Sequence, residues 1–466
     1  MKLIDKDLMS MQEVRELVES AKEAQRELAR MDQAQVDRIV KSIADAGVRN
    51  AKRLAQMAQE DTGFGVVSDK VVKNVFASRG VYEHIKDMKT IGEIERDDAK
   101  GLRKIAVPVG VIAGLIPSTN PTSTAFYKSE IAIKSGNAIV FSPHPTALRA
   151  IMETVKVIRQ AIAEAGANEN LVSCISIPTM EATSTLMHHR DIALILATGG
   201  SAMVKAAYSS GTPAIGVGPG NGPAYLEKTC DLPLAVKRIM DSETFDNGTI
   251  CASEQSIICD EDMAEAVQAE MERQGAYFLD EQEREQLGRF ILRANGTMNP
   301  EIVGKSVKTI ASLAHLDKVP ADARVLVAKE TGVGRGHPYS NEKLGPIMGF
   351  YTGKDYIDVC EKVCTILYYE GAGHTFSMHT KDDKMVDYFA KRVPASRIMV
   401  NTPSALGGIG ATTNLQPALT LGCGAVGGSA TSENVGPLQL LNYRYVAYGQ
   451  RELEDIKAQI PDCTDG

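Results

Sequence analysis

The sequence predicts an α/β protein with two Rossmann-like parallel-sheet domains and a small additional hairpin. Three observations support this prediction. Helical patterns fill the first ninety residues, and from about residue 105 short β-branched runs alternate with helix-length segments. The runs are apolar on both faces, which is typical of a parallel sheet covered by helices on both sides. The alternation resumes after residue 250, so we expect a second α/β domain.

The N-terminal part is predicted to form two helices. Ser10 and Glu13 match the capping box S-x-x-E, which marks a helix start. Apolar residues follow at helical spacing over 14–28, and a second stripe of the same period covers 36–43. We therefore expect both helices to precede the first sheet.

Apolar runs supply the strands of both predicted sheets. The first set is IAVPVGVIAGLI, NAIVFS, NLVSCISI, DIALILATGG and TPAIGVG, and the second is EQSIICD, ARVLVAKE, GHTFSMHT and SRIMVNTP. The piece TIGEIERDDAKGLRKIAVP, at about 90–108, is predicted to form a charged hairpin that pairs with another subunit. The segment beyond about residue 448 is polar, and we expect a linker or an appendage there.

The composition excludes several classes of partner. The chain has 466 residues, with 51 Lys plus Arg against 59 Asp plus Glu, and a formal net charge of -8. This acidic balance gives no diffuse attraction to nucleic acid or to anionic membranes. No apolar run approaches the roughly 20 residues that span a bilayer, and MKLIDKDLMSMQEVREL lacks a signal-peptide core. We expect a cytoplasmic protein.

The cysteines are scattered and contain no CxxC pair. The chain has 8 cysteines, and their spacing suits reduced thiols better than a disulfide framework. Cys360 and Cys364 lie four residues apart, which places them on one helix face and favours core packing over a metal site. We predict no metal site.

Three glycine patterns compete for a cofactor role. Gly422, Gly424 and Gly427 match G-x-G-x-x-G, but no apolar helix follows them, and VGKS at 303–306 lacks the first glycine of a P-loop. The third pattern, ILATGGSAMVKAAY, predicts a strand, a glycine turn and a helix that begins near Ser201. The free N–H groups of such a helix start suit an anion or a cofactor, although the glycines alone favour a simple turn.

The segment TFDNGTICASEQSIICD, at 244–260, carries the clearest chemical signal. Most cysteines are buried and inert, but Cys251 lies in a glycine-containing turn just before a predicted strand. The segment resembles the Gly-x-x-Cys nucleophile motif of the aldehyde dehydrogenase superfamily, with Asn247 and Gly248 preceding the cysteine. The extension Ala-Ser-Glu-Gln is similar to the branch that acylates coenzyme A, which includes the aldehyde half of bifunctional aldehyde–alcohol dehydrogenases.

Further motifs in the same order extend the resemblance over nearly the whole chain. IPSTNPTSTAFYK is similar to the segment that supplies the oxyanion donor, which implies that role for Asn120. NEKLGPIM resembles the Glu-x-Phe-Gly-Pro motif, so Glu342 is implied to contact the nicotinamide ribose, with Leu344 in place of phenylalanine. The other nucleotide-contacting residues that the resemblance implies are Ser142, Pro143, His144, Thr198, Gly199, Gly200, Ser201, Gly216 and Val217.

Two departures from the family pattern carry information. Hydrolytic members have a Glu-Leu-Gly-Gly motif whose glutamate activates water, whereas this chain has Gly216-Val217-Gly218-Pro219. Without that base, an acyl-enzyme should persist until a thiol attacks it. FSPH stands where many members carry a lysine for the adenosine ribose, which leaves the choice between NAD and NADP open.

The resemblance therefore implies that a short aldehyde, acetaldehyde or propionaldehyde, is oxidised with NAD to an acyl-coenzyme A. Cys251 is expected to be partly thiolate near neutral pH and to be the most readily alkylated cysteine, with its pKa lowered by N–H dipoles or by the nicotinamide cation. His374 either assists the coenzyme A thiol as a base or hydrogen-bonds a backbone carbonyl. The alternatives are a hydrolytic aldehyde dehydrogenase and a non-catalytic scaffold of a bacterial microcompartment.

The resemblance also assigns the domains. We expect a nucleotide-binding domain over 1–228 that includes the hairpin, a catalytic domain over 229–430, an oligomerisation strand over 431–448 and a tail over 449–466. The hairpin and the strand are predicted to cross between subunits of a homodimer or a homotetramer. Similar enzymes work inside bacterial microcompartments, which is an alternative to a free cytoplasmic location.

Overall fold

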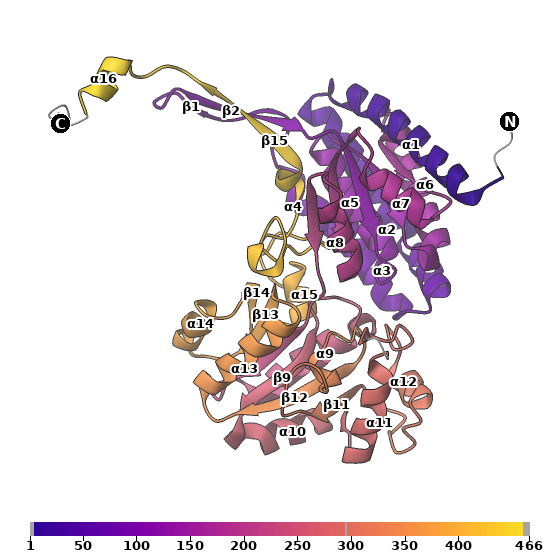
Figure 1. Ribbon diagram of the computed structural model, residues 1–466, viewed down its shortest axis with the longest axis vertical. Helices are drawn as coiled ribbons and strands as arrows, with labels where there is room; N and C mark the ends of the chain where they lie inside the picture. Colours follow the sequence, from indigo (N-terminus) through magenta and orange to yellow (C-terminus); the bar gives the residue numbers. More distant parts are fainter. Residues whose placement is uncertain (1–3, 294–295, 460–466) are drawn as a thin grey trace.

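The computed structural model describes residues 4–293 and 296–459. Two α/β units, each built on a parallel sheet, lie one above the other, and a narrow β arm projects from the first unit (Figure 1). The predicted α/β architecture with two parallel sheets and an additional hairpin is confirmed.

Two long helices open the chain, as predicted. They are α1 (Lys6–Leu28) and α2 (Gln33–Thr62), and both bury the apolar stripes found in the sequence. The predicted capping box is wrong, because α1 begins after the N-cap Asp5 and Ser10 is buried one turn further on. Glu13 instead accepts hydrogen bonds from the backbone N–H groups of Ser176 and Ile177, where it fastens α1 to a distant loop.

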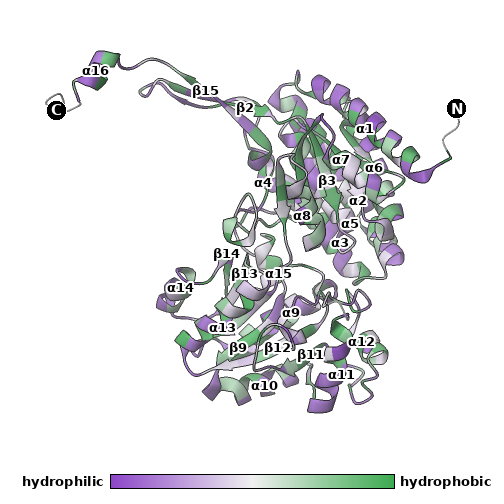
Figure 2. Cartoon of the chain, viewed as in Figure 1, coloured by the Kyte–Doolittle hydropathy of each residue, from purple (hydrophilic) through white to green (hydrophobic). Residues whose placement is uncertain are grey.

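The first sheet has five parallel strands in the order β5-β4-β3-β6-β7. Figure 2 shows hydrophobic residues along β3, at the centre of this sheet, where every residue is buried. The strands are β3 (Val111–Ile116), β4 (Ala138–Pro143), β5 (Val172–Cys174), β6 (Ile192–Thr198) and β7 (Ala214–Val217). The associated helices are α3 (Val67–Val75), α4 (Val81–Ile85), α5 (Pro121–Lys134), α6 (Leu148–Glu164), α7 (Met180–Met187) and α8 (Ser201–Ser209).

The second sheet has seven parallel strands in the order β10-β11-β12-β9-β8-β13-β14. The strands are β8 (Gly222–Leu226), β9 (Glu254–Asp260), β10 (Ala276–Phe278), β11 (Val325–Lys329), β12 (Ile347–Gly353), β13 (Gly373–His379) and β14 (Ala395–Val400). The helices are α9 (Leu232–Thr244), α10 (Ala264–Arg273), α11 (Glu281–Ile291), α12 (Val307–Leu313), α13 (Tyr356–Tyr369), α14 (Asp383–Ala390) and α15 (Ser404–Gly408). Because β8 pairs with β9 and β13, the sheets divide before residue 222 rather than at the expected boundary of 228.

The arm is a three-stranded antiparallel sheet that extends away from both units (Figure 1). Its order is β1 (Gly92–Asp97), β2 (Leu102–Pro108) and β15 (Leu441–Ala447), so the predicted hairpin pairs with a strand from the far end of the chain. A short exposed helix, α16 (Leu453–Lys457), follows. None of the helices in the described part of the chain is both long enough and apolar enough to cross a membrane.

Candidate functional site

A cavity of about 400 Å³ opens at the carboxyl ends of the first-sheet strands, where they face the loops of the second unit. Its lining includes residues that follow β3, β4 and β6, and Val217 at the end of β7. Parallel α/β sheets place ligand sites at this edge, because loops from several strands converge there. Cys251 and Asn120 both line this cavity, so residues 131 positions apart in the chain share one site.

A sharp turn presents Cys251 to the cavity. Asp246 and Asn247 have positive φ angles of 51° and 52°, and the chain then enters β9 three residues after the cysteine. Gly220 packs against this turn so closely that a Cβ atom there would lie 1.8 Å from the carbonyl oxygen of Cys251. Only glycine fits that position, so the loop between the two sheets and the cysteine turn are shaped to one another.

The environment of the Cys251 thiol differs from the expected one. Burial, followed by the nearby Glu342 carboxyl, raises the pKa of Cys251 to about 12, and Arg397 lowers it by less. The expectation that local N–H dipoles keep this pKa low is therefore wrong for the protein on its own. A desolvated thiol stays protonated near neutral pH unless a cation arrives to stabilise the thiolate.

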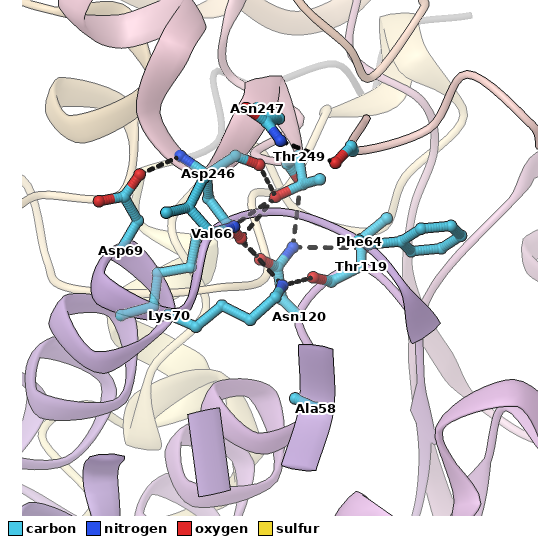
Figure 3. A network of polar contacts seen from close by, with 12 residues as sticks. Ala58, Phe64, Val66, Asp69, Lys70, Thr119, Asn120, Asp246, Asn247 and Thr249 are labelled. Carbon is cyan, nitrogen blue, oxygen red and sulfur yellow. Dashed lines mark hydrogen bonds and ion pairs between the residues drawn. The ribbon is translucent and has the colours of Figure 1, made fainter. Parts of the chain in front are cut away.

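Asn120 occupies the N-cap position of α5, beside the cysteine turn. Its Oδ1 accepts a hydrogen bond from Lys73 Nζ at 2.6 Å. Its Nδ2 donates to the carbonyl of Thr249 at 3.2 Å, two residues before Cys251 (Figure 3). The amide nitrogen therefore faces the segment that carries the nucleophile, as an oxyanion donor must.

Two buried lysines and one buried aspartate lie behind Asn120, and sequence patterns gave no sign of them. Asp246 Oδ2 accepts hydrogen bonds from both Lys70 and Lys73, and the three side chains are at most 4% exposed. Burial lowers the pKa of Lys73 to about 8, although Asp246 opposes that change. Asp246 stands five residues before the nucleophile, but its partners are more than 170 residues away in the sequence.

Glu342 also lines the cavity. Its Oε1 accepts a hydrogen bond from the backbone N–H of Gly220 at 2.8 Å, and its own N–H donates to Glu370 at 2.7 Å. Burial, and then repulsion from Glu370, raise the pKa of Glu342 well above its usual range. Glu342 is thus held in place by hydrogen bonds of both its side chain and its backbone.

His374 is fully buried behind Gly220 rather than on the cavity wall. Its Nδ1 lies 2.9 Å from the Thr375 hydroxyl, and its Nε2 has no hydrogen-bond partner among the described residues. Burial, with Arg397 nearby, lowers the pKa of His374 to about 3. The imidazole is therefore neutral, and its hydrogen bond is made to a hydroxyl rather than to the backbone carbonyl that was one of the two expectations.

The structure brings together most of the residues assigned to the nucleotide. The cavity is lined by His144, Thr198, Gly199, Gly200, Val217, Glu342 and Leu344. Ser201 borders an adjoining hollow that shares Gly218 and Pro219 with the cavity. Ser142 and Pro143 do not line it, and the Ser142 hydroxyl is instead paired with Thr183.

Gly216 does not face the cavity either. A Cβ atom on Gly216 would point at Val204 and Tyr208 of α8, at 2.7 and 3.0 Å. Side chains alternate along a strand, so the next residue, Val217, faces the cavity. Val217, the residue of this strand that faces the cavity, carries an apolar side chain and no carboxylate.

Comparison with known proteins agrees with this geometry. The model of the aldehyde dehydrogenase family matches residues 3–292. This chain belongs to the aldehyde dehydrogenase family. It is 45% identical over 440 residues to the bifunctional aldehyde-alcohol dehydrogenase AdhE of Escherichia coli, covering 93% of this chain and 49% of that protein. It is 37% identical to the acetylating succinate-semialdehyde dehydrogenase of Clostridium kluyveri, covering 94% of this chain and 96% of that one.

Solved structures of family members match the fold over almost the full length. A probable aldehyde dehydrogenase of Listeria monocytogenes is 62% identical, with a TM-score of 0.96 over 97% of this chain and 100% of that one. An acetylating aldehyde dehydrogenase of Geobacillus thermoglucosidasius is 50% identical, with a TM-score of 0.95 over 97% and 99%. A propionaldehyde dehydrogenase of Rhodopseudomonas palustris, solved with bound CoA and an acylated cysteine, is 27% identical, with a TM-score of 0.84 over 93% and 97%.

The raised thiol pKa predicts the alkylation behaviour of the nucleotide-free protein. With a pKa of about 12, the thiolate fraction of Cys251 should grow about tenfold per pH unit through pH 7 to 10. Iodoacetamide labelling of Cys251, measured by peptide mass spectrometry, should therefore rise over this range without a plateau. Cys364, which is half-buried on α13, is followed in the same samples as the internal reference. Rapid labelling of Cys251 with a plateau near pH 7 would contradict the raised pKa of its thiol.

Proposed function

We propose that this protein oxidises a short, neutral aldehyde with reduction of NAD and transfers the acyl group from Cys251 to coenzyme A. The observation that carries the proposal is the cavity that Cys251 and Asn120 both line, in which the end of β7 contributes the apolar Val217 rather than a carboxylate. The acetylating activity in the names of two relatives supports the transfer to coenzyme A. The chain spans about half the length of the bifunctional relatives that it matches, so it corresponds to one part of those proteins.

The site fits a nicotinamide nucleotide. Added Cβ atoms on Gly199 and Gly200 would meet nothing within 4 Å, so the backbone before α8 is open to a ligand. Gly200 is the N-cap of α8 and makes no side-chain cap, which leaves first-turn N–H groups for a pyrophosphate. When bound, the oxidised nucleotide accepts two electrons from the substrate carbon, and Glu342 is placed to hold its ribose.

The protein's own residues carry the remaining steps. The Cys251 sulfur attacks the aldehyde carbon as a thiolate and forms a thiohemiacetal. Asn120 Nδ2 and the backbone N–H of Cys251 donate to the oxyanion, and one such donor typically contributes about 2.7–4 kcal/mol to the barrier. Oxidation of that carbon leaves a thioester on Cys251, which the coenzyme A thiolate then attacks to release acyl-coenzyme A and the cysteine thiolate.

The cavity wall favours an uncharged substrate. Apolar side chains from several loops line the same cavity as Cys251, including Met298, Ile409, Leu419 and Leu421. Across the described ranges 4–293 and 296–459, neither Lys nor Arg is among the lining residues. Desolvating a carboxylate without a partner costs several kcal/mol, so a semialdehyde acid is disfavoured relative to acetaldehyde or propionaldehyde.

The arm is proposed to join subunits. In the described part of the chain, the outer edge of β15 has no partner strand. Tyr445, Val446 and Tyr448 on or after it are 65%, 38% and 57% exposed. An unpaired edge with exposed aromatic residues is a site at which a second strand or domain is expected. The cytoplasmic or microcompartment location stays a prediction.

Omitting coenzyme A from the assay tests whether the acyl group passes from Cys251 to coenzyme A rather than to water. We expect a burst of reduced nucleotide of about one per active site, followed by a very slow steady rate, because nothing activates water against the thioester. Stopped-flow absorbance measures the burst, and peptide mass spectrometry should find the acyl group on the Cys251 peptide. Cys251→Ala, the matched control, should bind nucleotide and give no burst. Sustained turnover to free acid without coenzyme A, as fast as with it, would overturn the proposal.

Assembly is tested by sedimentation equilibrium at micromolar concentration. We expect a homodimer or a homotetramer. Val446→Lys together with Tyr445→Asp should shift the equilibrium toward smaller species, because charges on an edge strand oppose strand pairing. Substitution of the exposed Ile456 on α16 by lysine is the control and should leave the mass unchanged. A wild-type monomer would refute this proposal without affecting the proposed chemistry.

A further inference from the structure

The buried ammonium of Lys73 lies directly behind the proposed oxyanion site. The side chain comes from α3 and is 2% exposed. It donates to Asn120 Oδ1 at 2.6 Å, to Thr249 Oγ1 at 2.8 Å and to the carboxylate of Asp246. An ammonium group has three N–H donors and no acceptor. All three donors are therefore engaged, and Lys73 has none left for a substrate, so any effect on catalysis passes through its partners.

The contact with Lys73 decides which way the Asn120 amide points. Because an ammonium cannot accept a hydrogen bond, only the amide oxygen can face it. The amide nitrogen must then face the other way, where it donates to the Thr119 hydroxyl and the Thr249 carbonyl, both at 3.2 Å. These bonds are at the long end of the normal range, so one N–H is readily transferred to a stronger acceptor such as an oxyanion.

Lys73 also holds the segment just before Cys251. Thr249 stands two residues before Cys251, and its hydroxyl contacts both Lys73 and Asp246 (Figure 3 shows Thr249 beside Asp246 and Asn120). Lys70 contacts Asp246 at 3.0 Å and the carbonyl of Thr119 at 3.2 Å, but it makes no hydrogen bond to the Asn120 side chain. The two lysines therefore share one counterion, but only Lys73 contacts the Asn120 side chain and the Thr249 hydroxyl, whereas Lys70 contacts the Thr119 carbonyl.

We propose that Lys73 is a positioning residue for acylation, which holds the Asn120 amide nitrogen toward the oxyanion that forms on Cys251. The inference rests on the proposed function of Asn120. Lys73 belongs to a cluster in which two lysines face Asp246 within hydrogen-bonding distance, and the nearby Asp69 carboxylate accepts from the Asp246 N–H. A cation in this place stabilises negative charge on the substrate oxygen through the polarised amide.

A double-mutant cycle on the intact enzyme tests the proposal. The quantity measured is the rate constant of the reduced-nucleotide burst without coenzyme A, in the wild type, Asn120→Ala, Lys73→Met and the double variant. Lys73→Met should slow the burst by about tenfold or more in the wild type and by less than about threefold in the Asn120→Ala background, because directly contacting residues are coupled. The nucleotide dissociation constant should stay within about twofold, since Lys73 does not line the cavity.

Lys70→Met is the matched control. It removes an equally buried lysine from the same carboxylate, so it reports the general cost of disturbing the cluster. Its effect on the burst should be the same fold-change with and without the Asn120 side chain. Lys73→Arg keeps the charge and again offers only donors to the Asn120 oxygen, so it should recover part of the rate that Lys73→Met loses.

The outcomes distinguish the positioning role of Lys73 from the role of Asn120 as the oxyanion donor. Equal fold-changes for Lys73→Met in both backgrounds would overturn the positioning role. A wild-type burst rate in Asn120→Ala would instead overturn the proposed role of Asn120. Where circular dichroism shows that Lys73→Met is unfolded, the same cycle with Lys73→Gln decides, because glutamine can still donate to Asp246.

Discussion

The carboxylate of Asp246 is the contact on which the geometry of the site depends. It accepts from Lys70 and Lys73 of the first unit and from the backbone N–H of Val66 at 2.7 Å, while its own backbone belongs to the turn that carries the nucleophile. Burial alone would raise its pKa, but the two lysines together lower it. Removing one partner of such a buried pair typically costs about 3–5 kcal/mol. This ion cluster therefore fixes the first unit against the cysteine turn in a defined position.

The chemistry follows from what surrounds that fixed turn. Cys251 is half-buried at the cavity, and desolvation raises its pKa, so a bound cation and a correctly oriented amide would favour the reaction by stabilising negative charge. The apolar Val217 and the hydrogen-bonded Glu342 leave water without an evident base near the thioester. An acyl-enzyme in such a site is protected from water and is open to a thiolate, which does not need a base beside the thioester.

Short sequence patterns predicted the sheets correctly and singled out Cys251. Apolar runs gave both parallel sheets, and the Cys251 segment pointed to the nucleophile, because these signals lie within a few consecutive residues. Three of the expectations that failed show where local patterns are not sufficient. The start of α1 was set by Asp5 rather than Ser10, Gly216 proved to face α8 rather than the cavity, and burial raised rather than lowered the pKa of the thiol.

The Lys73 cluster was not predicted because its contacts with Asp246 and Thr249 join residues that are more than 170 positions apart. Two lysines at helical spacing on α3 have the same pattern as a solvated helix face. Only the packing of α3 against the cysteine turn reveals that they are buried. The strand pairing of β15 with β2 has the same origin, since the two strands are far apart in the sequence.

The central claim is that the acyl group on Cys251 passes to coenzyme A much faster than to water, because the cavity offers water no base. The most direct measurement is the deacylation rate of acetyl-Cys251, loaded from p-nitrophenyl acetate and followed by intact-protein mass spectrometry. In the wild type, saturating coenzyme A should discharge the acyl group at least about 100-fold faster than water does, and Val217→Glu should raise the water rate about tenfold or more. Wild-type hydrolysis as fast as thiolysis would contradict the claim and would identify Glu342 as the residue to test for base catalysis.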